Sequence, residues 1–216
     1  MEEIVPGWMR STGHRVRIVH GASGNLARQV QQGLPVELFL SADDAFVFKL
    51  AEAGLTRDRG LVYASGRLAL LLAKGSAIDM DPQLRGLTAQ WSSIRKFAIA
   101  NPELAPYGKA AREVLQAVGL WDAAQRKLVM GESVAQVTQF VLTGSAQAGI
   151  TALSLLTGNE AAGLGQHVAL PDSLHAPLRQ RMVLLKQAGP AASALHQHLQ
   201  SAAAKATLRR HGLAAE

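Results

Sequence analysis

Three places where an expected strand or loop leads into a helix carry residues suited to binding an anion. Gly21-Ala-Ser-Gly24 offers the hydroxyl of Ser23 together with several backbone N–H groups. Pro106-Tyr-Gly108 presents Tyr107 just before a second helix, and Glu132-Ser-Val-Ala-Gln136 forms the third junction. Because the first turn of a helix has unpaired N–H donors and roughly half a positive charge, a dianion can bind there without a basic side chain.

Each junction also has a plainer interpretation. A glycine-rich loop is common between a strand and a helix, Tyr107 suits a half-buried helix start, and Ser133 or Glu132 suits a simple helix cap. A tetrahedral oxyanion, however, accepts hydrogen bonds from several directions, and each bond to a charged group contributes roughly 1.5–3 kcal/mol. Taken together, the three junctions favour a site for a small oxyanion.

Patterns typical of catalysis are not found in this sequence. It contains no G-x-S-x-G nucleophile turn, no G-x-x-x-x-G-K-[ST] phosphate loop and no G-x-G-x-x-G dinucleotide fingerprint. His196 and His198 are two residues apart, which places them on different faces of a helix and disfavours a shared metal. Cysteine is absent, which excludes disulfides, thiol catalysis and cysteine metal sites. We therefore expect no catalysis, no cofactor and no metal bound directly by the protein. An enzyme of unrecognised kind is kept as the least favoured of three hypotheses.

The composition suits a globular chain with a sizeable core. Of 216 residues, 48% are hydrophobic and 18% are charged, while aromatic residues make up 5%. The formal net charge is +6, but the basic residues are scattered and are not interleaved with aromatic side chains, so we expect no nucleic-acid partner. The longest apolar runs, such as Leu68–Ala73, are too short to cross a bilayer.

Segments of apolar β-formers alternate with amphipathic helical stretches along most of the chain. Expected strands lie at residues 16–19, 36–40, 62–73 with a bend at Gly66, 96–100, 127–130, 148–155, 167–170 and 182–185. Expected helices lie at residues 25–32, 44–54, 108–119, 132–143 and 191–211, the last interrupted near 200–204. This alternation predicts an α/β fold with mostly parallel sheets and helices on both faces.

Several short motifs, taken in their order and spacing, carry a family resemblance. They are His20-Gly-Ala-Ser-Gly-Asn-Leu-Ala-Arg28, Leu38-Phe-Leu-Ser-Ala-Asp-Asp44, Tyr63-Ala-Ser-Gly-Arg67, Ile99-Ala-Asn-Pro-Glu-Leu-Ala-Pro-Tyr-Gly108, Lys127-Leu-Val-Met-Gly-Glu132, Ala148-Gly-Ile150 and Ala152-Leu-Ser154. With these motifs the chain, from near Met1 to about Leu213, resembles the periplasmic molybdate-binding proteins of ABC importers, which have the type II periplasmic-binding-protein fold.

The resemblance implies two α/β lobes joined by hinge strands. Lobe 1 would comprise residues 1–68 and 178–216, and lobe 2, residues 69–177, would be inserted into it. A molybdate or tungstate ion would bind in the cleft between the lobes through neutral hydrogen-bond donors, so molybdenum enters only as the oxyanion. Matched to the family's motifs, Ser23 supplies its hydroxyl and N–H, Tyr107 falls where one branch contacts the ion through a tyrosine, and Val134 supplies its backbone N–H.

The same resemblance implies a place in transport. The family's members are periplasmic carriers that generally act as monomers and deliver their ligand to an ABC permease and its ATPase in the inner membrane. We therefore expect these partners, and a periplasmic location, for this chain.

One departure from the family concerns the N-terminus. Members begin with a signal peptide, a strand and a turn whose serine, or threonine–asparagine pair, binds the oxyanion. Here Met1 falls inside what would be the first helix of the family's fold, and residues 1–8 lack the pattern of a secretory signal. We expect lobe 1 to be N-terminally truncated, with a gap or an unpaired edge in its sheet. The alternative to transport is therefore a truncated remnant that keeps the fold but binds the oxyanion weakly or not at all.

Overall fold

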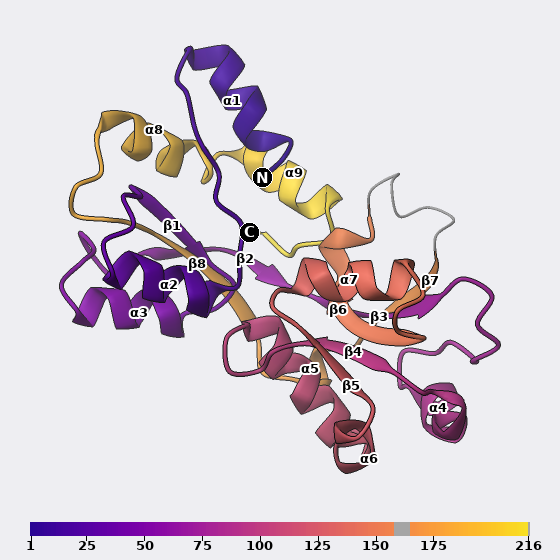
Figure 1. The fold of residues 1–216 in the computed structure, drawn as a ribbon. Coiled ribbons are helices and arrows are strands. Elements are labelled where there is room, and N and C mark those ends of the chain that lie inside the picture. The colour runs from indigo at the N-terminus through magenta and orange to yellow at the C-terminus, as the bar shows by residue number, and fades with distance from the viewer. Residues whose placement is uncertain (158–164, 216) are drawn as a thin grey trace. The chain divides into compact units, whose positions relative to one another are not determined.

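The computed structural model describes residues 1–157 and 165–215; the segment 158–164, which the sequence pattern predicts to be part of a loop rich in glycine and alanine, lies outside the described residues. The chain divides into two compact units, here called unit 1 (residues 1–65 and 179–216) and unit 2 (residues 66–178). Figure 1 labels the elements of each unit. The lobe boundaries predicted from the sequence, residues 1–68 with 178–216 for lobe 1 and 69–177 for lobe 2, stay a prediction.

Unit 1 is built on a three-stranded sheet in the order β1-β8-β2. Its strands are β1 (Leu38–Ser41), β8 (Leu178–Leu184) and β2 (Leu61–Gly66), with the ends of β8 and β2 crossing the unit boundary. The helices assigned to it are α1 (Ile4–Thr12), α2 (Ser23–Gln31), α3 (Ala45–Glu52), α8 (Pro190–His198) and α9 (Ala202–Arg210).

The core of unit 1 is divided between the two faces of this sheet. On one face Met182 packs in a cluster with residues of α1, α8 and α9, among them Trp8 and Leu208. On the other face Val183 packs with residues of α2 and α3, among them Val30 and Leu50. Because successive residues of a strand point to opposite faces, β8 joins the two clusters and has helices on both sides.

Unit 2 contains a five-stranded sheet in the order β5-β4-β6-β3-β7. The strands are β3 (Leu68–Ala73), β4 (Phe97–Ala100), β5 (Leu128–Gly131), β6 (Ala148–Ala152) and β7 (Gly165–Ala169). The α-helices that accompany it are α4 (Arg85–Ala89), α5 (Pro106–Ala117), α6 (Trp121–Gln125) and α7 (Val134–Leu142). Short 3₁₀ turns occupy Trp91–Ser93, Leu153–Leu155 and Asp172–Leu174.

The expectation of mostly parallel sheets is wrong in part. Strand β4 pairs in parallel with β5 and β6, and helices α5, α6 and α7 make the connections that parallel neighbours require. Strand β3, however, pairs antiparallel with β6 and β7, and β1 pairs antiparallel with β8. Strand–helix alternation indicates the order of the elements, but it does not indicate the direction of each strand in its sheet. Strand β3 illustrates this, because Arg67 alone separates it from β2 and no helix lies between them.

The expected strand at 16–19 is also wrong. Residues 13–22 form neither helix nor strand, and no strand in the described part of the chain pairs with them. Val16 and Ile18 do pack against the cluster formed by α1, α8 and α9, whereas Val19 is 38% exposed. Two apolar residues of this segment are therefore partly buried, although the segment is not a strand. A strand also needs a neighbour to accept and donate its backbone hydrogen bonds, and sequence pattern does not reveal that neighbour.

Most other expected elements are confirmed, with shifted ends. The long strand 62–73 is divided at Arg67 into β2 and β3, next to the bend expected at Gly66. The strand expected to reach residue 155 ends at Ala152, and the last helical region is interrupted between α8 and α9. Helix α2 begins at Ser23, two residues earlier than expected, which places this serine in the first helical turn.

Candidate functional site

The start of α2 in unit 1 presents one hydroxyl and uncapped backbone donors. The residue before the helix is Ala22, in extended conformation, and its side chain has no group that could cap the helix. Among the described residues, none accepts a hydrogen bond from the backbone N–H of Ser23 or Gly24. An anion at this position would accept hydrogen bonds from these N–H groups, which have no acceptor among the described residues.

The hydroxyl of Ser23 is held by the loop that follows β1. Ser23 is 7% exposed, and its Oγ accepts a hydrogen bond from the backbone N–H of Ala42 at 3.0 Å. A serine hydroxyl has one proton to donate and two acceptor positions. With Oγ accepting from Ala42, the proton of Ser23 remains available for an acceptor such as an oxyanion.

The neighbouring helix α3 begins differently. Asp43 Oδ1 accepts a hydrogen bond from the N–H of Phe46 at 3.3 Å, so a carboxylate of the chain already occupies the start of this helix. The helix expected at residues 44–54 therefore begins where the sequence places it, with Asp43 as an acceptor at its start. Of these two adjacent helix starts, that of α2 is the one left for an external anion.

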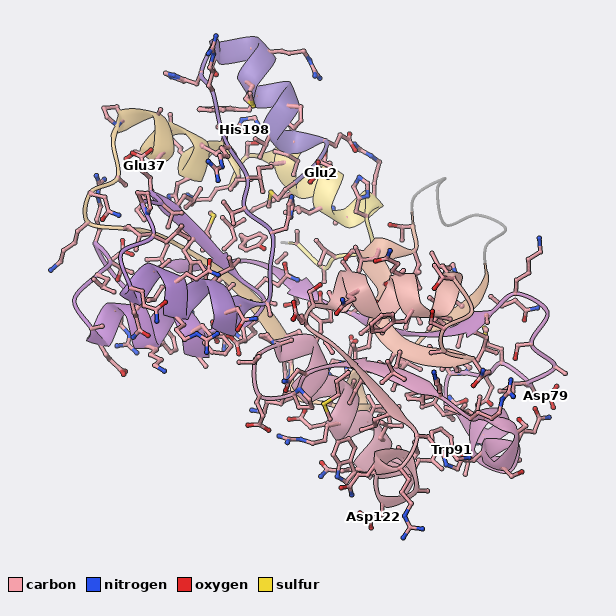
Figure 2. All side chains as sticks on the ribbon, viewed as in Figure 1. Glu2, Glu37, Asp79, Trp91, Asp122 and His198 are labelled. Carbon is pink, nitrogen blue, oxygen red and sulfur yellow. The ribbon has the colours of Figure 1, made fainter. Side chains whose placement is uncertain are left out.

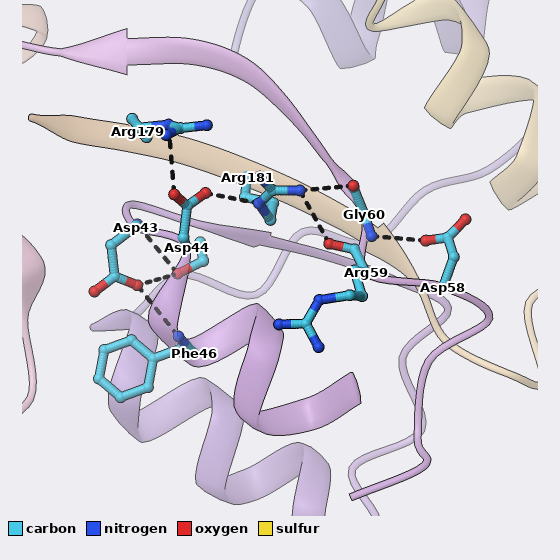
Figure 3. A network of polar contacts seen from close by, with 9 residues as sticks. Asp43, Asp44, Phe46, Asp58, Arg59, Gly60, Arg179 and Arg181 are labelled. Carbon is cyan, nitrogen blue, oxygen red and sulfur yellow. Dashed lines mark hydrogen bonds and ion pairs between the residues drawn. The ribbon is translucent and has the colours of Figure 1, made fainter. Parts of the chain in front are cut away.

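Asp44 is neutralised by two arginines (Figure 3). Arg181 Nε lies 2.6 Å from Asp44 Oδ1, and Arg179 Nε lies 3.4 Å from Asp44 Oδ2. The antiparallel register of β1 and β8 places Arg181 opposite Ser41, close to the end of β1 where Asp44 follows. Arg181 also donates to the carbonyl oxygens of Arg59 and Gly60, at 3.1 and 2.7 Å. The carboxylate is therefore paired rather than left to repel an anion at the start of α2.

In unit 2, helix α5 starts against the end of β4. Pro106 occupies the first helical turn, where a missing N–H costs nothing, and Tyr107 beside it is 6% exposed. A Cβ atom on Gly108 would lie 2.2 Å from the carbonyl oxygen of Ala100, so only glycine permits this approach of helix to strand. Tyr107 is thus fixed at the carboxyl end of β4.

The start of α7 is capped in part. Ser133 Oγ accepts from the N–H of Gln136 at 3.4 Å, and Gln136 Oε1 accepts from the N–H of Glu132 at 2.7 Å. The simple interpretation of Ser133 as a helix cap is therefore confirmed. No acceptor within the described chain reaches the N–H of Val134 or of Ala135. The cap leaves these two donors for a ligand.

Two of the three predicted site residues lie just after the carboxyl ends of neighbouring strands. Strands β4 and β5 are parallel neighbours with Ala100 paired to Gly131, and each is followed by the helix that carries a predicted site residue. Tyr107 and Val134 therefore follow the carboxyl ends of adjacent strands, which is where α/β sheets bind ligands. Ser23 belongs to unit 1.

Sequence reasoning missed the residues that hold these donors in place. Ala42 binds the hydroxyl of Ser23, and Thr138 and Thr151 bind the carbonyl of Val134, with the Thr151 hydroxyl 3.2 Å from it. The contact from Thr138 follows the ordinary four-residue pattern within a helix, but the contacts from Ala42 and Thr151 have no local signal in sequence, since Ala42 acts through its backbone. Thr151 and Val134 lie 17 residues apart on a strand and a helix.

The positions of the acidic and histidine side chains bear on metal binding. Within 1–157 and 165–215, no group of three or more histidine, aspartate or glutamate side chains is arranged to hold a metal ion. Figure 2 shows Asp79 and Asp122 on separate parts of unit 2, near α4 and on α6. Across the same ranges, no helix has the length and apolar character needed to cross a membrane.

Comparison with known proteins defines the class of this chain. The family model described as bacterial extracellular solute-binding protein matches residues 1–214. The chain therefore belongs to this family of solute-binding proteins.

The named relatives of the chain narrow the comparison to molybdate-binding proteins. The chain is 38% identical to the molybdate-binding protein ModA of Azotobacter vinelandii, over 98% of this chain and 84% of that protein. It is 35% identical to ModA of Rhodobacter capsulatus, over 100% of this chain and 83% of that protein. The solved periplasmic molybdate-binding protein of Azotobacter vinelandii superposes with a TM-score of 0.91 at 30% identity, covering 100% of this chain and 94% of that one. The family and the α/β periplasmic-binding-protein fold inferred from the sequence motifs are confirmed.

Proposed function

We propose that this chain is the solute-binding component of an ABC importer and that its ligand is molybdate or tungstate. The observation that carries the proposal is the 38% identity to a molybdate-binding protein over 98% of the chain. The partners would be an ABC permease and its ATPase in the inner membrane, and the protein would act in the periplasm as a monomer. Its role would be capture and delivery, without catalysis.

The proposed ligand residues are Ser23, Tyr107 and Val134. Ser23 would donate its hydroxyl proton and its N–H, and Val134 would donate its N–H from the start of α7. Support comes from the uncapped N–H groups of α2 and α7 and from the hydroxyl of Ser23, which accepts from the N–H of Ala42 and keeps its proton to donate. Tyr107 is supported by its place after β4, beside the strand that leads to Val134.

This donor set suits a transported dianion. Helix starts and hydroxyls attract negative charge without forming an ion pair, so release does not require the separation of two full charges. Charge-assisted hydrogen bonds contribute roughly 1.5–3 kcal/mol each, and several of them together sustain tight binding after the cost of ordering the ligand. Selection against the smaller sulfate would then depend on the dimensions of the cavity that encloses the ligand.

A panel of oxyanions tests the proposal. Melting midpoints and calorimetric affinities are measured with molybdate, tungstate, sulfate and phosphate at equal concentrations. A ligand at one hundred times its Kd adds about 2.7 kcal/mol to the free energy of unfolding, and each kcal/mol raises the midpoint by about 2–4 °C. We expect shifts with molybdate and tungstate only. A sulfate shift as large as that of molybdate would refute the selectivity, and no shift with any anion would refute the function.

A second candidate is a remnant that keeps the fold but binds the oxyanion weakly or not at all. The observation that favours it is the segment 13–22, which leads into Ser23 without belonging to a helix or strand. A donor at the end of an unpaired segment loses binding energy to the ordering of that segment. Amide hydrogen exchange of residues 13–22 with and without molybdate separates the two candidates. Slow exchange without ligand supports transport, whereas fast exchange together with a millimolar Kd supports the remnant.

A further inference from the structure

Two buried threonine hydroxyls meet behind the start of α7. Thr151 on β6 is fully buried and Thr138, one turn into α7, is 8% exposed. Their Oγ1 atoms lie 2.6 Å apart. The same two atoms lie 3.2 and 3.3 Å, respectively, from the carbonyl oxygen of Val134. Three polar contacts thus form one cluster, and two of them reach the carbonyl of a proposed ligand residue.

The number of protons determines how these contacts are made. Each threonine hydroxyl has one proton to donate, so two protons serve three short contacts. One hydroxyl must therefore donate to the other, and the second must donate to the carbonyl of Val134. Either threonine can be the one that donates to the carbonyl, since both hydroxyls lie within hydrogen-bond distance of that oxygen. The carbonyl receives a hydroxyl hydrogen bond in both arrangements.

This carbonyl belongs to the same peptide group as the N–H of Ala135. That N–H has no acceptor among the residues that the structure describes, and in a helix it points toward the N-terminal end, opposite to the carbonyl. A hydrogen bond accepted by the carbonyl polarises the peptide and strengthens its N–H as a donor. It also fixes the peptide plane, and with it the direction in which the N–H points.

We propose that Thr138 and Thr151 are positioning residues for the oxyanion site, and that the N–H of Ala135 binds the ligand beside that of Val134. The inference rests on the proposed function, since it deepens the same site. The pair holds and polarises the Val134–Ala135 peptide from the interior of unit 2. Burying two hydroxyls is costly unless they are hydrogen-bonded, and valine would fill the same space without that cost. A purely packing role would therefore not call for threonine at both positions.

The test compares single and double substitutions. Thr138→Val and Thr151→Val each leave one hydroxyl that can donate directly to the carbonyl of Val134, so we expect the molybdate Kd to rise by less than about threefold. The double variant leaves none, and we expect a rise of about tenfold or more, as for one lost hydrogen bond. The serine double variant, T138S/T151S, keeps both hydroxyls and should keep wild-type affinity.

Thr143 provides a matched control on the same helix. Its Oγ1 donates to the carbonyl of Gln139 at 2.9 Å, which is the same four-residue pattern at the exposed end of α7. Thr143→Val should leave the Kd unchanged. Nuclear magnetic resonance supplies a second measurement, because the Ala135 amide proton should shift downfield on adding molybdate to the wild type and shift less in T138V/T151V.

The outcomes separate this inference from the proposed function. If the wild-type chain does not bind molybdate, the proposed function fails and the inference fails with it. If the wild type binds and T138V/T151V binds equally well, the inference alone is overturned. It is also overturned if the binding free energies lost in the two single variants add up to the loss in the double variant. The same holds if the Ala135 amide shift on adding molybdate is equal in the wild type and in T138V/T151V.

Discussion

The two units position similar hydrogen-bond donors by different means. In unit 2 the donors follow parallel strands of a five-stranded sheet, and a buried threonine pair stands behind the start of α7. In unit 1 Ser23 follows a segment without secondary structure, and its hydroxyl is held by one backbone N–H from the loop after β1.

The cores of the two units also differ, in the number of large side chains that are fully buried. Among the twelve largest fully buried side chains of the described residues, Leu50 alone lies in unit 1, and the other eleven, including Leu70 and Phe97, lie in unit 2. Unit 1 divides its core between two faces of a three-stranded sheet. We infer that unit 2 positions its donors on a more completely buried core, whereas in unit 1 the position of the Ser23 hydroxyl depends more on a single polar contact.

The largest expected effect tests this difference in packing. Leu70→Ala, at a fully buried position of β3, should lower the free energy of unfolding by about 2–5 kcal/mol. Leu195→Ala in unit 1, where the side chain is 6% exposed, should cost less because the site can relax toward solvent. Urea denaturation of both variants provides the measurement. An equal or larger loss for Leu195→Ala would contradict the comparison.

The second prediction concerns the hydroxyl of Ser23. Ser23→Ala should weaken molybdate binding by about 1–3 kcal/mol, the cost of a hydrogen bond to a charged group. Stability without ligand should change little, although the N–H of Ala42 loses its acceptor. Ser11→Ala removes a hydroxyl that donates to the carbonyl of Trp8 in the same unit and serves as the calorimetric control. Wild-type affinity in Ser23→Ala would exclude Ser23 from the site.

The third prediction addresses the ion pairs of unit 1. Asp44→Asn should destabilise the chain by about 1–2 kcal/mol, because Arg181, with a side chain only 12% exposed, keeps its carbonyl partners but loses its carboxylate. Glu3→Gln breaks the exposed pair with Arg210 and should cost less than about 0.5 kcal/mol. Thermal melts at low and moderate salt measure both. A Glu3→Gln effect as large as that of Asp44→Asn would show that burial does not govern these pairs.

The smallest expected effect is a pH dependence in unit 2. The N–H of Gly86, with those of Arg85 and Gln83, binds the Asp81 carboxylate and lowers its pKa. A folded pKa below the unfolded one adds stability that is present above the unfolded pKa and is lost as the pH falls through the folded pKa. The wild type should therefore lose more stability than Asp81→Asn on going below about pH 4. Denaturation at pH 6, 4 and 3 compares them, and parallel curves would contradict the assignment.

Much of this protein was determined by local sequence. The Gly21–Gly24 loop, Pro106 at a helix start and the cap at Ser133 are local signals, and each was predicted together with the helix that follows it. The family itself could be recognised from short motifs, because their order is written in the chain. These features depend on residues close in sequence, where propensity and hydrogen-bonding chemistry decide the outcome.

The remaining features were decided by tertiary structure. Whether 16–19 becomes a strand depends on a neighbour, and the direction of β3 depends on where the chain enters the sheet. The Arg181–Asp44 pair joins positions 137 residues apart, and the Thr138–Thr151 contact joins a helix to a strand. Such contacts arise from register and packing between distant segments, and no pattern within either segment specifies its partner. The donors of the proposed site are therefore readable from sequence, while the contacts that hold them in position are not.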